Sequence, residues 1–152
     1  MININLICVG NLKEKFSRDE QAEYQKRLSA FCNLQITEIK EQNQFDNPQV
    51  TLEREGKEIC KRLKGYVVLC DIKGKELSSE NLAQKLENLS LENSTLTFVV
   101  GGSYGVSEEV YAKANEKMSF SPMTFPHNLF RIMLLEQIYR AFTISSGKSY
   151  HK

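Results

Sequence analysis

The sequence predicts an α/β protein with a mostly parallel sheet and helices on its faces. Apolar runs of strand length alternate along the chain with segments of helical period. This alternation is typical of parallel strands joined by helical crossovers. The chain has 152 residues, of which 41% are hydrophobic and 26% charged. We therefore expect a single domain over residues 1–152 with its own core.

Five segments have the composition of buried strands. Each is rich in β-branched, aromatic and other apolar residues, which fit the pleated surface of a sheet. They are INLICVG (4–10), LQITEIK (34–40), YVVLCDI (66–72), LTFVVGG (96–102) and KMSFSP (117–122).

Helix-start signals separate these strands. In the segment 17–31, Ser17 and Glu20 have the spacing of a capping box. The next helix has Asn47 as its cap and Pro48 at its first position, and is expected to continue to about Leu63. Ser107 can cap a helix that begins with two glutamates. Two helices have one apolar face each, formed by Tyr24, Leu28 and Phe31 in the first and by Leu82, Leu86 and Leu89 in SSENLAQKLENL.

The last predicted helix, NLFRIMLLEQIYRAFTISSG (128–147), is the most apolar of the chain. Its apolar stripe is wider than one sheet face would cover. We expect a second buried contact, for which a homodimer is the economical source. The alternative is a central helix buried within a monomer. The stripe consists of Ile132, Leu134, Leu135, Ile138, Tyr139, Ala141 and Phe142.

Charge and cysteine content exclude several classes of function. The 20 Lys and Arg residues nearly balance the 19 Asp and Glu residues, so any surface for nucleic acid must be a local patch. The N-terminus has no signal peptide, and no apolar run is long enough for a membrane span, so we expect a cytoplasmic protein.

Four widely spaced cysteines without a C-x-x-C motif are interpreted as small buried side chains rather than as a metal or redox site: Cys8, Cys32, Cys60 and Cys70.

The stretch GGSYG (101–105) follows a buried strand and precedes a helix. Ligands of open parallel sheets bind beyond the carboxyl ends of the strands, and glycine lets the backbone adopt positive φ or approach a ligand closely. No phosphate-loop motif and no cation occur in the loop, so a nucleoside without phosphates fits better than a nucleotide. The alternative is a tight turn that holds nothing. A second loop, with Pro122 and Pro126, is expected to complete a cleft.

The chain closely resembles a known family in four stretches: INLICVGNLKEKF, FVVGGSYGVSEEV, MSFSPMTFPHNLFRIMLLEQIYRAFTI and the terminal YHK. This is methyltransferase H, the bacterial ribosomal RNA pseudouridine N3-methyltransferases of the SPOUT class. The resemblance implies an α/β fold with a C-terminal trefoil knot, a homodimer without metal, and S-adenosylmethionine as cofactor. The implied substrate is a pseudouridine in helix 69 of 23S ribosomal RNA, on assembled ribosomes.

The resemblance also implies site residues. The cofactor contacts are Cys70, Gly101, Phe120, Ser121, Pro122, Met123, Thr124 and Phe125. Cys70 stands where relatives commonly have Leu, and Tyr104 where a smaller polar residue is expected. The tail, which alone would be taken for a frayed terminus, is expected to order over the cofactor when RNA binds. The catalytic residues implied or favoured are Arg140, Tyr150, His151 and Lys152.

Two of these interpretations have alternatives. Arg140 is the best cation for a phosphate or carbonyl contact, but a helix pair with Glu136 would also explain it. His127 could either cap the last helix or line the cleft. A different class of function also stays open, a ribosome-associated binding module without catalysis. A third reading, a nucleotide-binding protein acting on small molecules, is disfavoured because the chain has no phosphate loop.

Overall fold

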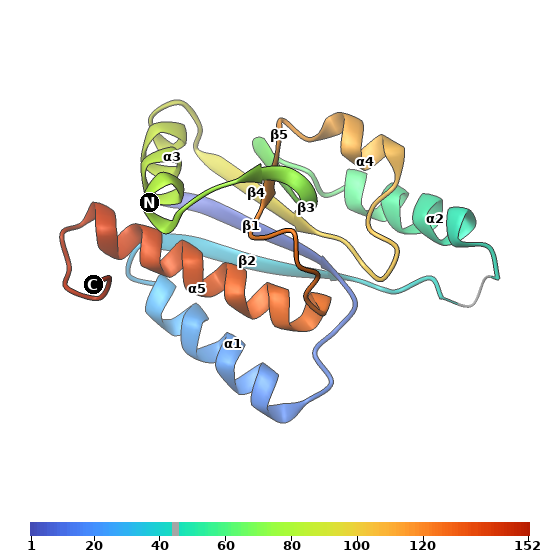
Figure 1. The fold of residues 1–152 in the computed structure, drawn as a ribbon, viewed down its shortest axis with the longest axis horizontal. Helices are drawn as coiled ribbons and strands as arrows, with labels where there is room; N and C mark the ends of the chain where they lie inside the picture. The colour runs from blue at the N-terminus through green and yellow to red at the C-terminus, as the bar shows by residue number, and fades with distance from the viewer. Residues whose placement is uncertain (44–45) are drawn as a thin grey trace.

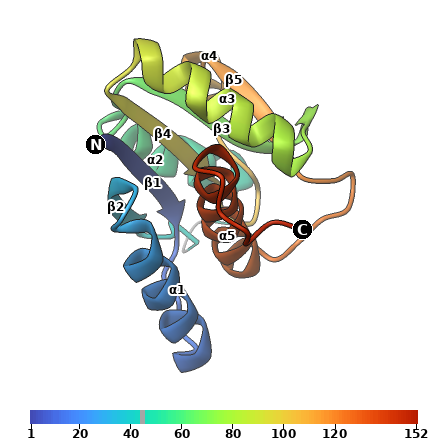
Figure 2. The ribbon, with the colours of Figure 1, turned by 90° about the vertical axis from the view of Figure 1, so that its left-hand side faces the viewer.

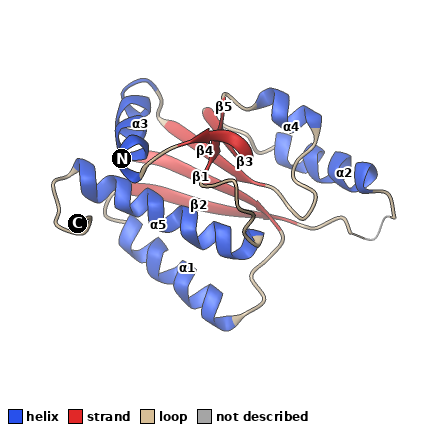
Figure 3. Ribbon diagram, viewed as in Figure 1, coloured by secondary structure: helices blue, strands red, loops and turns tan. Residues whose placement is uncertain are grey.

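A computed structural model gives the fold and describes residues 1–43 and 46–152. Its centre is one five-stranded sheet in which all neighbouring strands are parallel, in the order β2-β1-β4-β3-β5 (Figures 1 and 3). The α/β class and the five predicted strands are confirmed. The strands are β1 (Ile2–Val9), β2 (Cys32–Ile39), β3 (Tyr66–Glu76), β4 (Thr95–Val100) and β5 (Glu116–Ser119).

The helices form a layer on each face of the sheet. One face carries α1, α3 and α5, and the other carries α2 and α4 (Figures 1 and 2). The helices are α1 (Lys15–Leu28), α2 (Pro48–Cys60), α3 (Ser79–Glu92), α4 (Glu108–Lys113) and α5 (His127–Ser145).

Strand β1 shows why the predicted strands are almost continuously apolar. Ile4 and Leu6 belong to the core under α1, α3 and α5, whereas Ile7 and Val9 belong to the core under α2 and α4. Because helices cover both faces of a parallel sheet, side chains of both alternating sets are removed from water.

The predicted caps are confirmed at two helices and wrong at one. Asn47 accepts a hydrogen bond from the Gln49 N–H at 2.9 Å, and Ser107 accepts one from the Val110 N–H at 3.3 Å. The capping box in α1 is wrong. That helix begins at Lys15 after Glu14, without a side-chain cap, so Ser17 already lies within the first turn. The second helix ends at Cys60 rather than near Leu63.

The wide apolar stripe of α5 is buried within the single chain. Helix α5 packs against both α1 and α3 (Figure 2), and Tyr139 and Phe142 are half-buried beside it. The ring of Phe142 stacks on that of Phe31, with centroids 5.5 Å apart. The stripe therefore needs no partner chain, as the alternative of a central helix predicted. Exposure is at most 5% for Ile132, Leu134, Leu135, Ile138 and Ala141.

Strand β3 is irregular where it pairs with its parallel neighbour β5. Met118 pairs first with Cys70 and again with Lys75, and the register shifts between these two contacts. A Cβ atom on Gly74 would lie 2.6 Å from the backbone nitrogen of Met118, so glycine permits this close approach. The end of β3 is curved (Figure 1), and residues 70–72 line the same cavity as residues of the segment that follows β5.

The four cysteines are free thiols, two of them fully buried. Within residues 1–43 and 46–152, no three His, Cys, Asp or Glu side chains are grouped as a metal site requires. None of the helices described there combines the length and the apolar character needed to cross a membrane.

Candidate functional site

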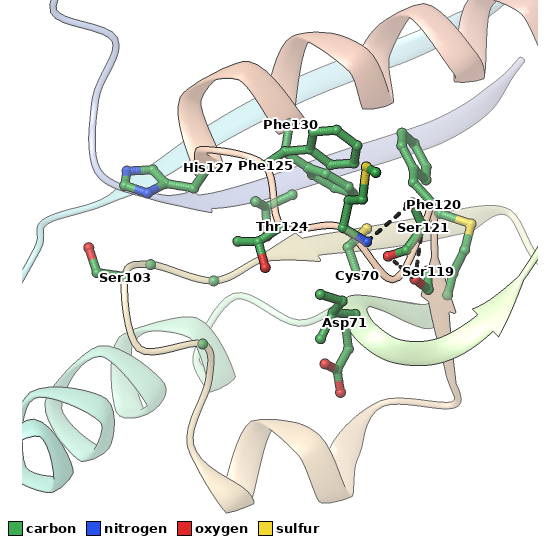
Figure 4. A pocket seen from close by; sticks show the side chains of 17 residues that line it. Cys70, Asp71, Ser103, Ser119, Phe120, Ser121, Thr124, Phe125, His127 and Phe130 are labelled. Carbon is green, nitrogen blue, oxygen red and sulfur yellow. Dashed lines mark hydrogen bonds between the residues drawn. The ribbon is translucent and has the colours of Figure 1, made fainter.

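A cavity of about 310 Å³ opens at the carboxyl ends of β3, β4 and β5. Three segments line it: residues 70–72 after β3, residues of the glycine loop 100–105, and residues between 118 and 130 (Figure 4). The cleft expected from the strand ends is therefore present, and it is formed by the two loops named from the sequence.

Seven of the eight expected cofactor contacts line this cavity. The exception is Pro122, whose ring lies outside the lining although both of its neighbours belong to it. Sequence reasoning missed Asp71, Ile72, Ser103, Ser119 and Phe130, of which Asp71 and Ile72 directly follow an expected contact. The seven are Cys70, Gly101, Phe120, Ser121, Met123, Thr124 and Phe125.

The glycine loop is a tight turn closed by its own backbone. Gly102 and Gly105 form an antiparallel bridge, and the Gly105 N–H donates to the Gly102 carbonyl at 3.1 Å. Positive φ occurs at Gly105, with φ of 84°, but not at Gly101 or Gly102. A Cβ atom on Gly101 would lie 2.5 Å from the carbonyl oxygen of Gly105. Gly101 is thus required by close packing within the loop and not by positive φ, which was the other use expected of a glycine here.

Serine side chains shape the second loop. The Ser121 N–H donates to the Ser119 hydroxyl at 3.2 Å, and the Met123 N–H donates to the Ser121 hydroxyl at 3.0 Å (Figure 4). Such side-chain turns replace backbone pairing where neither helix nor strand continues. The ring of Phe120 contacts that of Phe130 with centroids 4.6 Å apart, which ties the loop to the first turn of α5.

The chemistry of the cavity fits an uncharged nucleoside portion of a ligand. Phenylalanine side chains and Ile72 supply apolar walls, while hydroxyls and loop backbone supply hydrogen-bonding groups. Burial raises the pKa of the Cys70 thiol, so this side chain is neutral. No Lys or Arg occurs among the described residues of the lining, and a pyrophosphate would therefore find no neutralising cation.

His127 lines the cavity at its glycine-loop end (Figure 4). It is the first residue of α5, and Pro126 occupies the cap position. Its Nε2 lies 3.4 Å from Oε1 of Glu41. Of the two interpretations of His127, the structure supports the one in which it lines the cleft.

A second cavity of about 400 Å³ adjoins the first, between α3 and α5. Its polar lining includes Ser79 and Glu136. The Ser79 hydroxyl donates to the Gln137 side-chain oxygen at 2.6 Å. Four side chains line both cavities and separate them: Met118, Ser119, Phe120 and Phe125.

The C-terminal tail folds back along α5 and is fastened next to the second cavity (Figure 1). The Tyr150 hydroxyl donates to Oε2 of Glu136 at 2.8 Å, and Nε of Arg140 donates to Oε1 of the same carboxylate at 3.0 Å. Nε2 of His151 lies 2.7 Å from Oε1 of Glu80. Three of the expected catalytic residues, Arg140, Tyr150 and His151, thus lie together, while Lys152 is exposed beyond them.

The tail does not reach the first cavity. Among the described residues that line that cavity, the last along the chain is Phe130. The expected pair of Glu136 and Arg140 is present, and Arg140 also reaches the tail, with Nη1 3.0 Å from Nδ1 of His151. Burial raises the pKa of Tyr150 to about 12, and its hydrogen bond to Glu136 adds to the shift. Its phenol is therefore a hydrogen-bond donor at neutral pH.

Arg131 is a structural residue that the sequence reasoning missed. Its side chain is 1% exposed and donates to the Gly10 carbonyl at 2.9 Å and to Oε2 of Glu38 at 2.6 Å. These contacts fix the first turn of α5 to the ends of β1 and β2. Its position inside the apolar stripe of α5 could have indicated this role, because a buried arginine requires partners.

Comparisons with a family model and with related proteins agree on the family of this chain. The family model described as "Predicted SPOUT methyltransferase" matches residues 2–151. A Ribosomal RNA large subunit methyltransferase H of Clostridium botulinum (strain Loch Maree) is 48% identical over 159 residues, covering 99% of this chain and 100% of the relative. A protein of the same name from Fusobacterium nucleatum is 44% identical over 155 residues, with the same coverage. The chain belongs to the SPOUT methyltransferase family.

Proposed function

We propose that this protein transfers a methyl group from S-adenosylmethionine to N3 of a pseudouridine in helix 69 of 23S ribosomal RNA, on assembled ribosomes in the cytoplasm. The observation that carries the proposal is the pair of adjoining cavities, one of nucleoside size and one beside a fastened polar tail. The names of the related methyltransferases support the class of substrate.

The first cavity holds the methyl donor mainly through backbone and apolar contacts. Backbone groups of residues 120–125 match the edge of an adenine, and the Ile72 and Phe125 side chains can cover its faces. The Pro122 peptide contributes to this loop although its ring lies outside the lining. When bound, the donor supplies an electrophilic methyl group for in-line displacement. The work of the chain is to align the acceptor with that methyl group.

The second cavity receives the acceptor base. N3 of the base carries a proton, and negative charge develops on the ring carbonyls as that proton leaves. When the acceptor base binds, Arg140 and Tyr150 turn from Glu136 to stabilise this charge. Release of Nδ1 from Arg140 then lets His151 take the proton. Its Nδ1 faces a guanidinium, so the imidazole in this arrangement is neutral and can act as a base. Lys152 contacts the phosphate backbone of the RNA.

The chain acts as one domain and as a homodimer, with a trefoil knot in its C-terminal segment. Exposed apolar side chains support the dimer, among them Phe16 at 71% and Leu129 at 49% exposure. Two chains would combine their surfaces against the RNA, because a net charge of +1 gives each chain little general attraction for a polyanion. Light scattering measures the mass, and a monomer at micromolar concentration would contradict the dimer.

Ribosomal RNA from cells that lack this gene tests the function. Mass spectrometry should find one methyl group missing from a pseudouridine of helix 69, and the purified protein with S-adenosylmethionine should restore it on isolated ribosomes. Ribosome binding without restoration would indicate the non-catalytic binding module instead. An unchanged RNA mass in these cells would contradict the proposed substrate.

A further inference from the structure

A buried carboxylate lies behind the glycine-loop end of the first cavity. Glu55, on α2, is 5% exposed. Its Oε1 lies 3.5 Å from the position of a Cβ atom on Gly102, a residue of the cavity lining. Its Oε2 accepts from the Gln42 N–H at 3.0 Å, the one hydrogen bond to this carboxylate within residues 1–43 and 46–152. Oε1 therefore faces the wall of the cavity without a hydrogen-bond donor from the described chain.

Helix α2 also fixes the position of a second carboxylate, that of Glu41. Thr51, one turn before Glu55, donates its hydroxyl to the Gln42 carbonyl at 2.8 Å. Both backbone groups of Gln42 are thus held by α2, which fixes the position of Glu41 beside it. Glu41 in turn lies 3.4 Å from Nε2 of His127.

The electrostatic balance at this end of the cavity is negative. Burial raises the pKa of Glu55, and the neighbouring Glu41 adds to this shift, while the Gln42 N–H and His127 lower it. The cation of Arg131 lies four residues after His127 but is neutralised by Glu38 at 2.6 Å. Two carboxylates therefore face one imidazole, and a positively charged ligand group would relieve their repulsion.

We propose that this end of the cavity binds the α-ammonium group of the amino-acid part of the methyl donor, with His127 as the direct acceptor. The inference rests on the proposed function, because it assumes that S-adenosylmethionine occupies this cavity. Nε2 lies 3.4 Å from Glu41, so Nδ1 is the nitrogen left to accept a charge-assisted hydrogen bond from the ammonium. Glu41 and Glu55 supply the negative potential behind it.

The opposite assignment, an imidazolium that binds the carboxylate of the donor, is disfavoured by the two acids. An anion placed there would be repelled by Glu41 and by the unpaired oxygen of Glu55. The two assignments predict opposite effects of pH. Protonation of His127 removes the acceptor in the first case and creates the binding group in the second.

Calorimetric titration with two uncharged-sulfur ligands tests the assignment. S-adenosylhomocysteine has the amino-acid part, and 5′-methylthioadenosine lacks it. For His127→Ala we expect binding of the first to weaken about tenfold or more, the scale of a hydrogen bond to a charged group. Binding of the second should remain within about twofold of the wild type, because the adenosine contacts are unchanged.

A charge variant and a matched control sharpen the test. Glu55→Gln keeps the shape and the acceptor for the Gln42 N–H, and should selectively weaken S-adenosylhomocysteine. Thr51→Val breaks the companion bond to Gln42 without a change of charge, and should affect both ligands alike. Lowering the pH from about 7.5 to about 5.5 should weaken S-adenosylhomocysteine relative to methylthioadenosine, because a protonated imidazole has no acceptor. His127→Ala should reduce this dependence.

Each contrary outcome has a distinct meaning. Equal weakening of both ligands by His127→Ala would overturn the assignment in favour of a structural role, and no weakening would remove His127 from the site. Stronger relative binding of S-adenosylhomocysteine at low pH would establish the carboxylate assignment instead. If neither ligand bound the wild-type protein, the proposed cofactor site itself would fail, and that result is separable from the others.

Discussion

The guanidinium of Arg140 lies 3.0 Å from Nδ1 of His151. Arginine has donors and no acceptor, so this nitrogen must be the acceptor and the imidazole must be neutral. The proton of the ring is then on Nε2, which donates to Glu80 at 2.7 Å. This hydrogen bond in turn lowers the pKa of Glu80. The tail is thus fastened at both imidazole nitrogens.

Removal of the tail should separate cofactor binding from catalysis. A chain that ends at Ser149 lacks Tyr150, His151 and Lys152 but keeps both cavities. We expect normal binding of S-adenosylmethionine and a loss of methyl transfer to ribosomes of about 100-fold or more, the lower scale of acid-base assistance. Methylation at the wild-type rate would show that the tail is not catalytic.

Single changes at His151 should distinguish proton transfer from closure of the tail. His151→Ala should lower the rate in a pH-dependent way if the imidazole takes the N3 proton. His151→Gln retains a donor and an acceptor near Arg140 and Glu80, so it should order the tail without restoring the rate. Rates measured on ribosomes between about pH 6 and 8.5 give the comparison. Recovery with glutamine would indicate that the tail acts by ordering alone.

Glu55 should make the protein less stable as pH rises through the acidic range. Burial raises the pKa of this carboxyl in the folded state. Between the unfolded value, about 4.3, and the higher folded value, the folded chain keeps a proton that the unfolded chain has lost. Stability therefore falls with pH in this window. Glu55→Gln should raise the urea midpoint at neutral pH and leave it nearly unchanged at pH about 4, below both pKa values.

Gly101 should tolerate no side chain. Its added Cβ would meet the Gly105 carbonyl at 2.5 Å, so Gly101→Ala should open the loop and destabilise the protein by about 1–3 kcal/mol, the usual effect of overpacking. Gly101→Val should abolish binding of S-adenosylmethionine. Gly105→Ala is the control, since its Cβ would meet nothing within 4 Å but its φ is positive, at an expected loss of about 1 kcal/mol. A folded Gly101→Val variant with normal affinity would place the cofactor elsewhere.

Arg131 should matter more to stability than a surface arginine in an equally short ion pair. Arg131→Met leaves the Gly10 carbonyl without its donor, whereas Glu38 is 41% exposed and can be solvated. We therefore expect a loss of about 1–3 kcal/mol, the cost of an unsatisfied buried acceptor. The control is Arg27→Met, because Arg27 pairs with Glu23 at 2.8 Å in an exposed position and should change stability by about 1 kcal/mol or less. Urea unfolding measures both. Equal effects would contradict the anchoring role of Arg131.

The sequence predicted the strands and the position of the cleft because these depend on local pattern. Buried parallel strands are continuous apolar runs, and Asn47 with Pro48 is a local helix start. The start of α1 was wrong because Ser17 and Glu20 have the spacing of a capping box, while the backbone already enters the helix at Glu14. Spacing alone does not show which residue has the non-helical dihedral angles of a cap.

Features that depend on distant segments could not be predicted in the same way. Arg131 and Glu38 are 93 residues apart, and Glu55 lies behind the glycine loop on α2, in the far layer of helices. The wide stripe of α5 was expected to need a partner chain, but α1, α3 and the sheet, all distant in sequence, cover it. The meeting of Arg140 with the tail likewise depends on a chain reversal after Gly147, whose φ is 72°.

The place of α5 at the end of the chain has a consequence for synthesis of the protein. Its buried side chains complete the core that β1, α1 and α3 began, although it is translated last. A nascent chain that ends before residue 127 exposes that apolar face, and such unfinished surfaces favour aggregation and chaperone binding. The last two residues of the cavity lining, His127 and Phe130, are also missing until then. Folding and the capacity to bind a ligand should therefore arise together, in the final stage of translation.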